Sequence, residues 1–184
     1  MMSYWKTIIP GPSPPDLVYA IIECPKKTQN KYEMSKTTNL IKLDRVLHSS
    51  VMYPQDYGFI PGTYAPDGDA LDILVLITNP THPGIIITTR PIGVLIMEDE
   101  KGVDEKILGI ALNDPIYNDY FELEDIPKHA LDEIQEFFRT YKNLEEPKYA
   151  SVKTWENRAT ALDIIERSIK DFNGKYGDVA NLIP

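Results

Sequence analysis

Short apolar and β-branched runs alternate with turn-forming residues through the first two thirds of the chain. The runs cover residues 18–24, 40–46, 71–77, 85–89, 92–97 and 107–112. Pairs such as Pro61-Gly62 and Pro83-Gly84 separate them, and residues 53–58 read as an aromatic turn. Strands at this spacing are typical of a small closed barrel or a sandwich.

The last third of the chain changes to helical periodicity. Apolar residues recur at helical spacing between residues 126 and 141, with Asp125 as the expected N-cap and Pro127 near the first turn. A second helix is expected from about residue 158 to residue 172, with Asn157 as N-cap and Gly174 and Gly177 as stop signals. Residues 149–155 predict a further strand. The pattern favours an α+β, mainly β fold with two main helices outside a barrel.

Length, charge and cysteine content narrow the class of protein. A chain of 184 residues suits one domain, residues 1–184, and its net charge of −9 argues against a nucleic-acid partner. No apolar run approaches the ~20 residues that span a bilayer, and the N-terminus lacks the apolar core of a signal peptide, so we expect no membrane partner. Cys24 is the only cysteine and predicts a buried thiol. A cytoplasmic location follows as an expectation.

The most informative stretch is the acidic hexapeptide at residues 67–72. Asp67, Asp69 and Asp72 place three carboxylates in six residues, and Gly68 permits a turn between them. Like charges this close repel one another unless a cation neutralises them or one carboxylate takes up a proton. Oxygen-rich sites select hard cations such as magnesium, manganese or calcium. A solvated acidic turn is the alternative that the hexapeptide alone leaves open.

A second acidic stretch follows the run at residues 92–97. It comprises Glu98, Asp99, Glu100, Asp104 and Glu105, with Lys101 and Lys106 between them. Taken alone, this composition is typical of a solvated loop.

Several established motifs are absent from the sequence. A calcium EF-hand loop counted from Asp67 would need glycine and glutamate where Asp72 and Thr78 stand, and no P-loop string occurs. His48, His82 and His129 are scattered along the chain, which does not favour a histidine metal site.

Cations and phenols stand beside other apolar runs, and with the acidic stretches they resemble a known family. The matching segments, in order, are Glu23 before Pro25, Lys31-Tyr32-Glu33, Asp44-Arg45, Tyr53 with Tyr57, the string from Asp67 to Ile73, Arg90-Pro91-Ile92-Gly93, Asp99-Glu100 through Asp104 and Lys106, and Tyr141-Lys142 through Glu145. This pattern, spread over residues 16–169, resembles the family I soluble inorganic pyrophosphatases of the short prokaryotic type. The family signature runs D-x-D-[PE]-hydrophobic-D.

The resemblance implies a role for each matching residue. Asp67, Asp72 and Asp104 would hold the tightest magnesium ion, and Asp99, Glu100 and Glu33 would help to hold ions that arrive with substrate. Asp69 would be the general base, with Tyr57 hydrogen-bonded near the nucleophile. The residues implied to bind the phosphoryl groups are Lys31, Arg45, Tyr57, Lys106, Tyr141 and Lys142. Glu23 and Tyr53 would support the site from behind.

The resemblance also implies an activity and an assembly. It implies magnesium-dependent hydrolysis of pyrophosphate to two phosphates by a metal-bound water, with several Mg²⁺ ions per site. Mn²⁺ or Zn²⁺ would be substitutes and Ca²⁺ an inhibitor. The implied fold is an OB-like five-stranded closed barrel, and the implied assembly is a homohexamer built as a dimer of trimers.

Two departures from the family pattern bear on these expectations. Ala70 replaces the usual proline or glutamate, which costs about 0.4–1 kcal/mol through a freer unfolded chain and removes no ligand. Glu136 and Thr140 stand where bacterial members often carry histidines, so details of the hexamer interface are expected to differ.

Two other classes of function are compatible with parts of the pattern. An OB-type binding module could hold structural calcium in its acidic loops without turnover. A metal-dependent hydrolase of nucleotides or phosphomonoesters would use similar carboxylates, but the chain has no long insertion to form a base or sugar pocket. Both rank below pyrophosphate hydrolysis.

Overall fold

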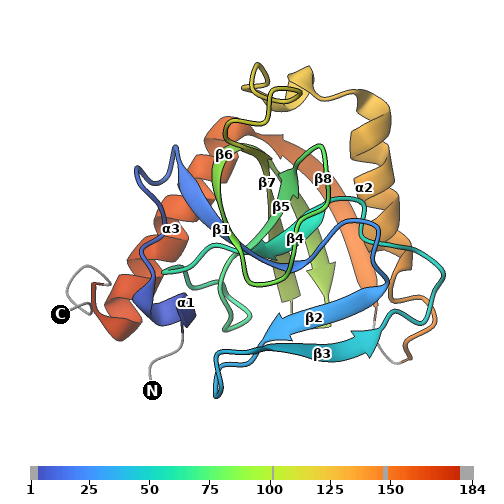
Figure 1. The fold of residues 1–184 in the computed structure, drawn as a ribbon, viewed down its shortest axis with the longest axis horizontal. Coiled ribbons are helices and arrows are strands. Elements are labelled where there is room, and N and C mark those ends of the chain that lie inside the picture. The colour runs from blue at the N-terminus through green and yellow to red at the C-terminus, as the bar shows by residue number, and fades with distance from the viewer. Residues whose placement is uncertain (1–3, 101, 147–148, 179–184) are drawn as a thin grey trace.

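Five strands pair in a ring in the computed structural model, which describes residues 4–100, 102–146 and 149–178 (Figure 1). In ring order they are β1 (Val18–Cys24), β4 (Asp56–Phe59), β5 (Asp72–Leu76), β7 (Gly102–Ala111) and β6 (Ile86–Asp99), which pairs back to β1. β5 and β7 run parallel, and the other neighbours are antiparallel. The ring confirms the closed, OB-like, mainly β fold.

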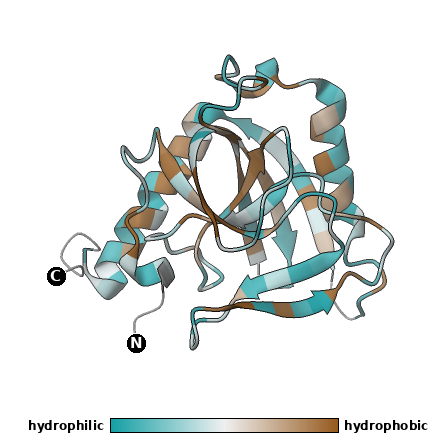
Figure 2. Ribbon diagram, viewed as in Figure 1, coloured by the Kyte–Doolittle hydropathy of each residue, from teal (hydrophilic) through white to brown (hydrophobic). Residues whose placement is uncertain are grey.

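Three further strands of the described residues lie outside the ring. β8 (Ala150–Asn157) extends the sheet beyond β6 and confirms the strand expected at residues 149–155. β2 (Asn30–Met34) and β3 (Ile41–Val46) form a separate two-stranded hairpin, which Figure 1 shows below the ring. Figure 2 shows brown, apolar segments concentrated in the ring and mostly teal, polar residues along the hairpin.

The two long helices cover different parts of the sheet, and Figure 1 shows them on opposite sides of the ring. α2 (Lys128–Thr140) packs with a core cluster that includes Leu74 and Leu76 of β5, whereas α3 (Arg158–Tyr176) packs with the cluster that includes Ile73 and Val75. Side chains alternate along a strand, so β5 is apolar on both faces because each face meets a helix-covered core. Two short elements complete the described residues, the helix α1 (Tyr4–Thr7) and the 3₁₀ helix η1 (Leu123–Asp125). No helix within the described residues is long and apolar enough to cross a membrane.

Several strand predictions were wrong in their limits. The runs expected at 85–89 and 92–97 merge into one strand, β6, from Ile86 to Asp99, because Pro91 lies at a register shift of the ladder, where its missing N–H is tolerated. Residues 56–59 form β4 rather than a turn, because Gly58 lets β4 approach the backbone of β1. The second acidic stretch is not a solvated loop, because Asp99 ends β6 and Asp104 lies in β7.

The helix ends differ from prediction at two points. Asp125 is not the N-cap of α2, a position that Pro127 holds; its carboxylate instead accepts hydrogen bonds from the backbone of Phe121 and Glu122 around η1. Asn157 is confirmed as the N-cap of α3, because its side chain accepts from the Thr160 N–H at 3.1 Å. Gly174 lies inside α3, which ends at Tyr176 and is followed by its C-cap Gly177 with a φ of 86°.

Cys24 is fully buried at the end of β1, as expected. Burial raises the pKa of its thiol to about 12, so the group is protonated at neutral pH and acts as a small apolar residue.

Candidate active site

A cleft of about 670 Å³ opens between the β2–β3 hairpin, the acidic loop and the ends of β6 and β7. Every residue predicted for the site lines this cleft except Tyr53, which lies behind it. The lining predicted residues are Glu23, Lys31, Glu33, Arg45, Tyr57, Asp67, Asp69, Asp72, Asp99, Glu100, Asp104, Lys106, Tyr141 and Lys142. The cleft thus collects side chains from segments that are far apart in sequence, from Glu23 of β1 to Lys142 after α2.

Strand register brings Asp72 and Lys106 together at the centre of the cleft. The two residues are direct partners in the parallel β5–β7 ladder, and the Lys106 ammonium pairs with the Asp72 carboxylate. The same ammonium lies 2.7 Å from Asp104, two residues earlier on β7. Lys106 is only 4% exposed, and although burial disfavours its charge, Asp104 and Asp72 outweigh that effect and hold its pKa above the ordinary value. Burial raises the pKa of Asp104, so this carboxyl depends on its cationic neighbour to stay ionised.

Tyr57 contributes a hydroxyl to the same group of side chains. Its OH donates to Asp72 at 2.6 Å, and burial raises the pKa of the phenol well above its ordinary value, so the group remains a donor. Tyr53 packs against the Tyr57 ring with 5.4 Å between centroids and against Phe137 at 4.9 Å. Tyr53 is therefore a support for Tyr57 and does not face the cleft.

Lys142 joins the two carboxylates at the end of β6. Its ammonium lies 2.9 Å from Asp99 and 2.9 Å from Glu100, and the residue follows directly after the C-cap of α2, Tyr141. Burial disfavours the charge of Glu100, but its hydrogen bond to Lys142 prevails and lowers the pKa. The short Asp99–Glu100 turn is thereby tied to the end of α2.

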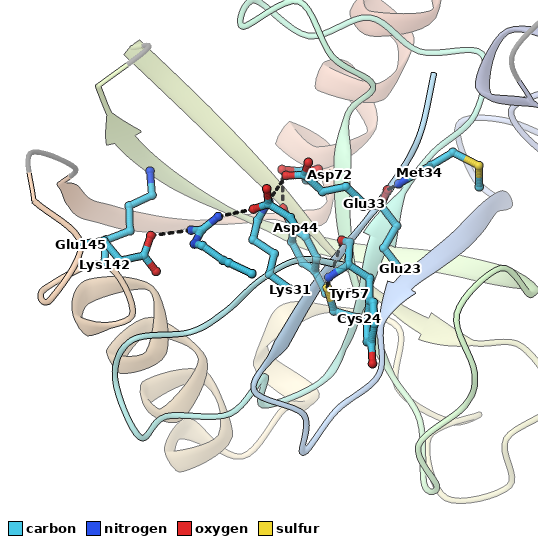
Figure 3. Close-up of polar contacts among 12 residues, drawn as sticks. Glu23, Cys24, Lys31, Glu33, Met34, Asp44, Tyr57, Asp72, Lys142 and Glu145 are labelled. Atoms are coloured by element: carbon cyan, nitrogen blue, oxygen red, sulfur yellow. Dashed lines mark hydrogen bonds and ion pairs between the residues drawn. The ribbon is translucent and has the colours of Figure 1, made fainter. Parts of the chain in front are cut away.

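The hairpin carries its own chain of ion pairs. Lys31 pairs with Glu33 and lies 3.8 Å from Asp44, while Arg45 contacts Asp44 at 2.5 Å and Glu145 at 2.7 Å. Figure 3 shows Glu145 and Asp44 joined by dashed lines through that guanidinium. Glu145 is 4% exposed and was not given a role from the sequence. Its position three residues after Lys142, at the end of the matched Tyr141–Glu145 segment, was the available signal.

The acidic loop itself faces the cleft, which disfavours the reading as a simple solvated turn. Asp67 accepts a hydrogen bond from the Asp69 N–H at 3.1 Å, across Gly68 with its φ of 93°. Asp69 pairs with Lys36, a residue of the cleft that sequence reasoning missed. Trp5, Lys42 and Asp44 also line the cleft and were not predicted.

The donor set of the cleft fits hard divalent cations. Nine carboxylates and six cationic side chains line it, so negative charge is in excess, and every carboxylate donor is an oxygen. Burial raises the pKa of Glu23 to about 8, against the opposing hydrogen bond from the Met34 N–H, and the charge of nearby Asp72 adds a smaller upward contribution. Within the described residues no three acidic, histidine or cysteine side chains stand together as a ready-made metal cage, because lysines occupy the carboxylates.

Comparisons with known proteins agree with this geometry. The family model described as inorganic pyrophosphatase matches residues 20–173. A protein of Haloferax volcanii named inorganic pyrophosphatase is 46% identical over 169 residues, covering 92% of this chain and 96% of the relative. One of Synechocystis with the same name is 47% identical over 164 residues, covering 89% and 96%.

Solved structures give the same result. The crystal structure of inorganic pyrophosphatase from Thermus thermophilus superimposes with a TM-score of 0.91 at 42% identity, covering 94% of this chain and all of that one. The structure of an inorganic pyrophosphatase from Coxiella burnetii gives a TM-score of 0.86 at 39% identity, covering 90% and 99%. With the ring of strands and the acidic cleft, these matches lead to one conclusion: the chain belongs to the inorganic pyrophosphatase family.

Proposed function

We propose that the protein hydrolyses inorganic pyrophosphate to two phosphates in this cleft, with Mg²⁺ as its cofactor. One observation carries the proposal: carboxylates suited to a hard cation and cations suited to phosphate line the same cleft, already interleaved as ion pairs. Pyrophosphate with magnesium presents both complementary charges at once. Each lysine could then exchange its carboxylate for a phosphoryl oxygen while each carboxylate takes a metal ion.

The carboxylates divide into two groups in this proposal. Asp67, Asp72 and Asp104 hold the tightest magnesium ion, and Asp99, Glu100 and Glu33 hold ions that enter with substrate. Bound magnesium lowers the pKa of a coordinated water and neutralises phosphoryl oxygens. The protein contributes the positions of these carboxylates: Asp72, Asp99 and Asp104 lie on strands β5, β6 and β7, Glu33 lies on β2, and Asp67 lies in the acidic loop before β5.

Other side chains act on the proton and on the phosphoryl groups. Asp69 accepts the proton of the attacking water. Its carboxylate lines the cleft beside Asp67, and it is not one of the residues proposed above to hold magnesium, so it is available as a base. The Tyr57 hydroxyl is a hydrogen-bond donor close to the attacking water. Arg45 offers a planar fork to phosphoryl oxygens and is held in place by buried Glu145.

Lys31, Lys106, Tyr141 and Lys142 supply the remaining contacts to the phosphoryl groups, where positioning and charge provide most of the catalysis. We further propose a cytoplasmic homohexamer of the dimer-of-trimers type, with Mn²⁺ or Zn²⁺ as substitutes and Ca²⁺ as an inhibitor.

The role of Asp69 is the sharpest test of the proposed chemistry. Phosphate release from pyrophosphate is measured for the wild type and for Asp69→Asn at saturating magnesium, with magnesium affinity measured by calorimetry. We expect the variant to bind magnesium and to lose most of its turnover. Near-native release by Asp69→Asn would refute its role as base, and no release by the wild type would refute the function.

A further inference from the structure

The short helix α1 lies beside the acidic loop, although it precedes the residues matched by the family model. Trp5 of α1 is 5% exposed and its side chain lines the cleft. The Trp5 carbonyl accepts a hydrogen bond from the Gly62 N–H at 2.8 Å, so α1 is tied to the turn that leads into the loop.

An aromatic cluster built on Trp5 supports both ends of the acidic loop. The Trp5 ring meets Phe172 edge-on at 5.9 Å and Tyr176 at 5.7 Å, which agrees with the position of α1 beside the end of α3 in Figure 1. Tyr64, at the start of the loop, packs against Tyr176 at 6.0 Å, and Ala70, at its end, packs against the same cluster. The loop that carries Asp67 and Asp69 is therefore held at two points by one apolar platform.

Trp5 also contacts Lys36, which pairs with Asp69. The Lys36 ammonium pairs with Asp69 and lies 5.4 Å from the centroid of the Trp5 ring, within the range of a cation–π contact. Lys36 is 55% exposed at its side chain, so the ring is a fixed surface beneath an otherwise mobile ammonium. Trp5 can thus hold Asp69 in position through two sets of contacts, the aromatic cluster under Ala70 and the Lys36 ammonium.

We propose that Trp5 is a positioning residue for Asp69. Trp5 affects the turnover rate through the position of the Asp69 carboxylate and does not itself bind substrate. The inference rests on the proposed function, because it concerns the residue that we assign as base. Displacing a reacting group by about 1 Å costs up to about a hundredfold in rate. The platform would therefore act on kcat, whereas pyrophosphate contacts made by Arg45, Lys106 and Lys142 would remain.

The first test separates positioning from simple loss of packing. kcat and KM for pyrophosphate are measured with magnesium for Trp5→Ala, Trp5→Phe and the control Trp155→Ala, each corrected for its folded fraction by circular dichroism. Trp155 is the only other tryptophan, packs against a different core cluster and is not a lining residue of the cleft. We expect kcat to fall about tenfold in Trp5→Ala with KM within twofold, and to recover to within about threefold of wild type in Trp5→Phe, which keeps a ring. Trp155→Ala should retain kcat within twofold.

The second test asks whether Trp5 acts through Lys36. In a double-mutant cycle with Lys36→Ala, the combined loss of kcat should be clearly smaller than the product of the two single losses, because one route is shared. An unchanged kcat in Trp5→Ala, an equal loss in Trp5→Phe or in Trp155→Ala, or a fully multiplicative cycle would overturn the inference while wild-type activity stands. No release by the wild type would overturn the proposed function and the inference together.

Discussion

Replacing Lys106 by methionine tests the charge balance at the centre of the cleft. The side chain of Lys106 is 5% exposed, and its ammonium is shared between Asp72 and Asp104, which are 27% and 19% exposed. Removing one partner of a buried ion pair costs about 3–5 kcal/mol, because the other charge stays buried and unpaired. Water reaches both carboxylates, so we expect a loss near the lower limit, about 3 kcal/mol. Methionine fills a similar volume, which confines the change to charge.

Thermal unfolding followed by circular dichroism measures this loss. For a chain of this length, about 3 kcal/mol corresponds to a fall in Tm of about 6–12 °C at pH 7 in EDTA. Magnesium should restore more of the Tm of Lys106→Met than it adds to wild type, because the freed carboxylates gain a cation. Lys153→Met is the matched control: its pair with Glu98 spans 2.9 Å at about half exposure, so the loss should stay under about 1 kcal/mol. A fall in Tm of less than 2 °C for Lys106→Met in EDTA would refute the reasoning.

Three further predictions concern Glu23, Gly58 and Gly174. The pKa of Glu23 is about 8 in the folded chain against an ordinary value of 4.5, so the folded state binds more protons between these pH values and the stability from this group falls as pH rises. Urea unfolding in EDTA at pH 5 and pH 8 should show that decline in the free energy of unfolding of the wild type and a smaller decline in Glu23→Gln. Equal declines in the two proteins would contradict the prediction. A Cβ on Gly58 would stand 1.9 Å from the Ile21 carbonyl oxygen, so Gly58→Ala should lose about 1–3 kcal/mol. Gly174→Ala, with no atom within 4 Å and a helical position, should gain up to about 0.8 kcal/mol, and a similar sign for both glycine variants would refute the steric argument.

Much of the fold could be predicted from the sequence because the strands with apolar runs are buried. β1 and β5 were anticipated because their apolar runs are buried, and both long helices because apolar residues recur at helical spacing. β8 was also anticipated, although its residues are only half-buried or exposed. β2 escaped prediction because its residues Asn30–Met34 are mostly polar and only half-buried along one wall of the cleft. A strand whose side chains serve a site carries no hydrophobic period.

The residues of the candidate site were predicted from residue type and from the family resemblance. The ion pairs between those residues were not predicted. Asp72 and Lys106 are 34 residues apart, and only the parallel register of β5 and β7 makes them neighbours. The lysine partners of the carboxylates, the guanidinium support by Glu145 and the platform under Trp5 depend on tertiary contacts that no local pattern encodes.

Phosphate release by the wild-type protein from pyrophosphate, ATP and a phosphomonoester, each with magnesium or with calcium, tests the central claim most directly. The account predicts rapid release from pyrophosphate with magnesium, little from the other two substrates, and little from pyrophosphate with calcium. Release from ATP or the phosphomonoester at a rate equal to or above that from pyrophosphate, or stabilisation by calcium with no release from pyrophosphate under either metal, would contradict it.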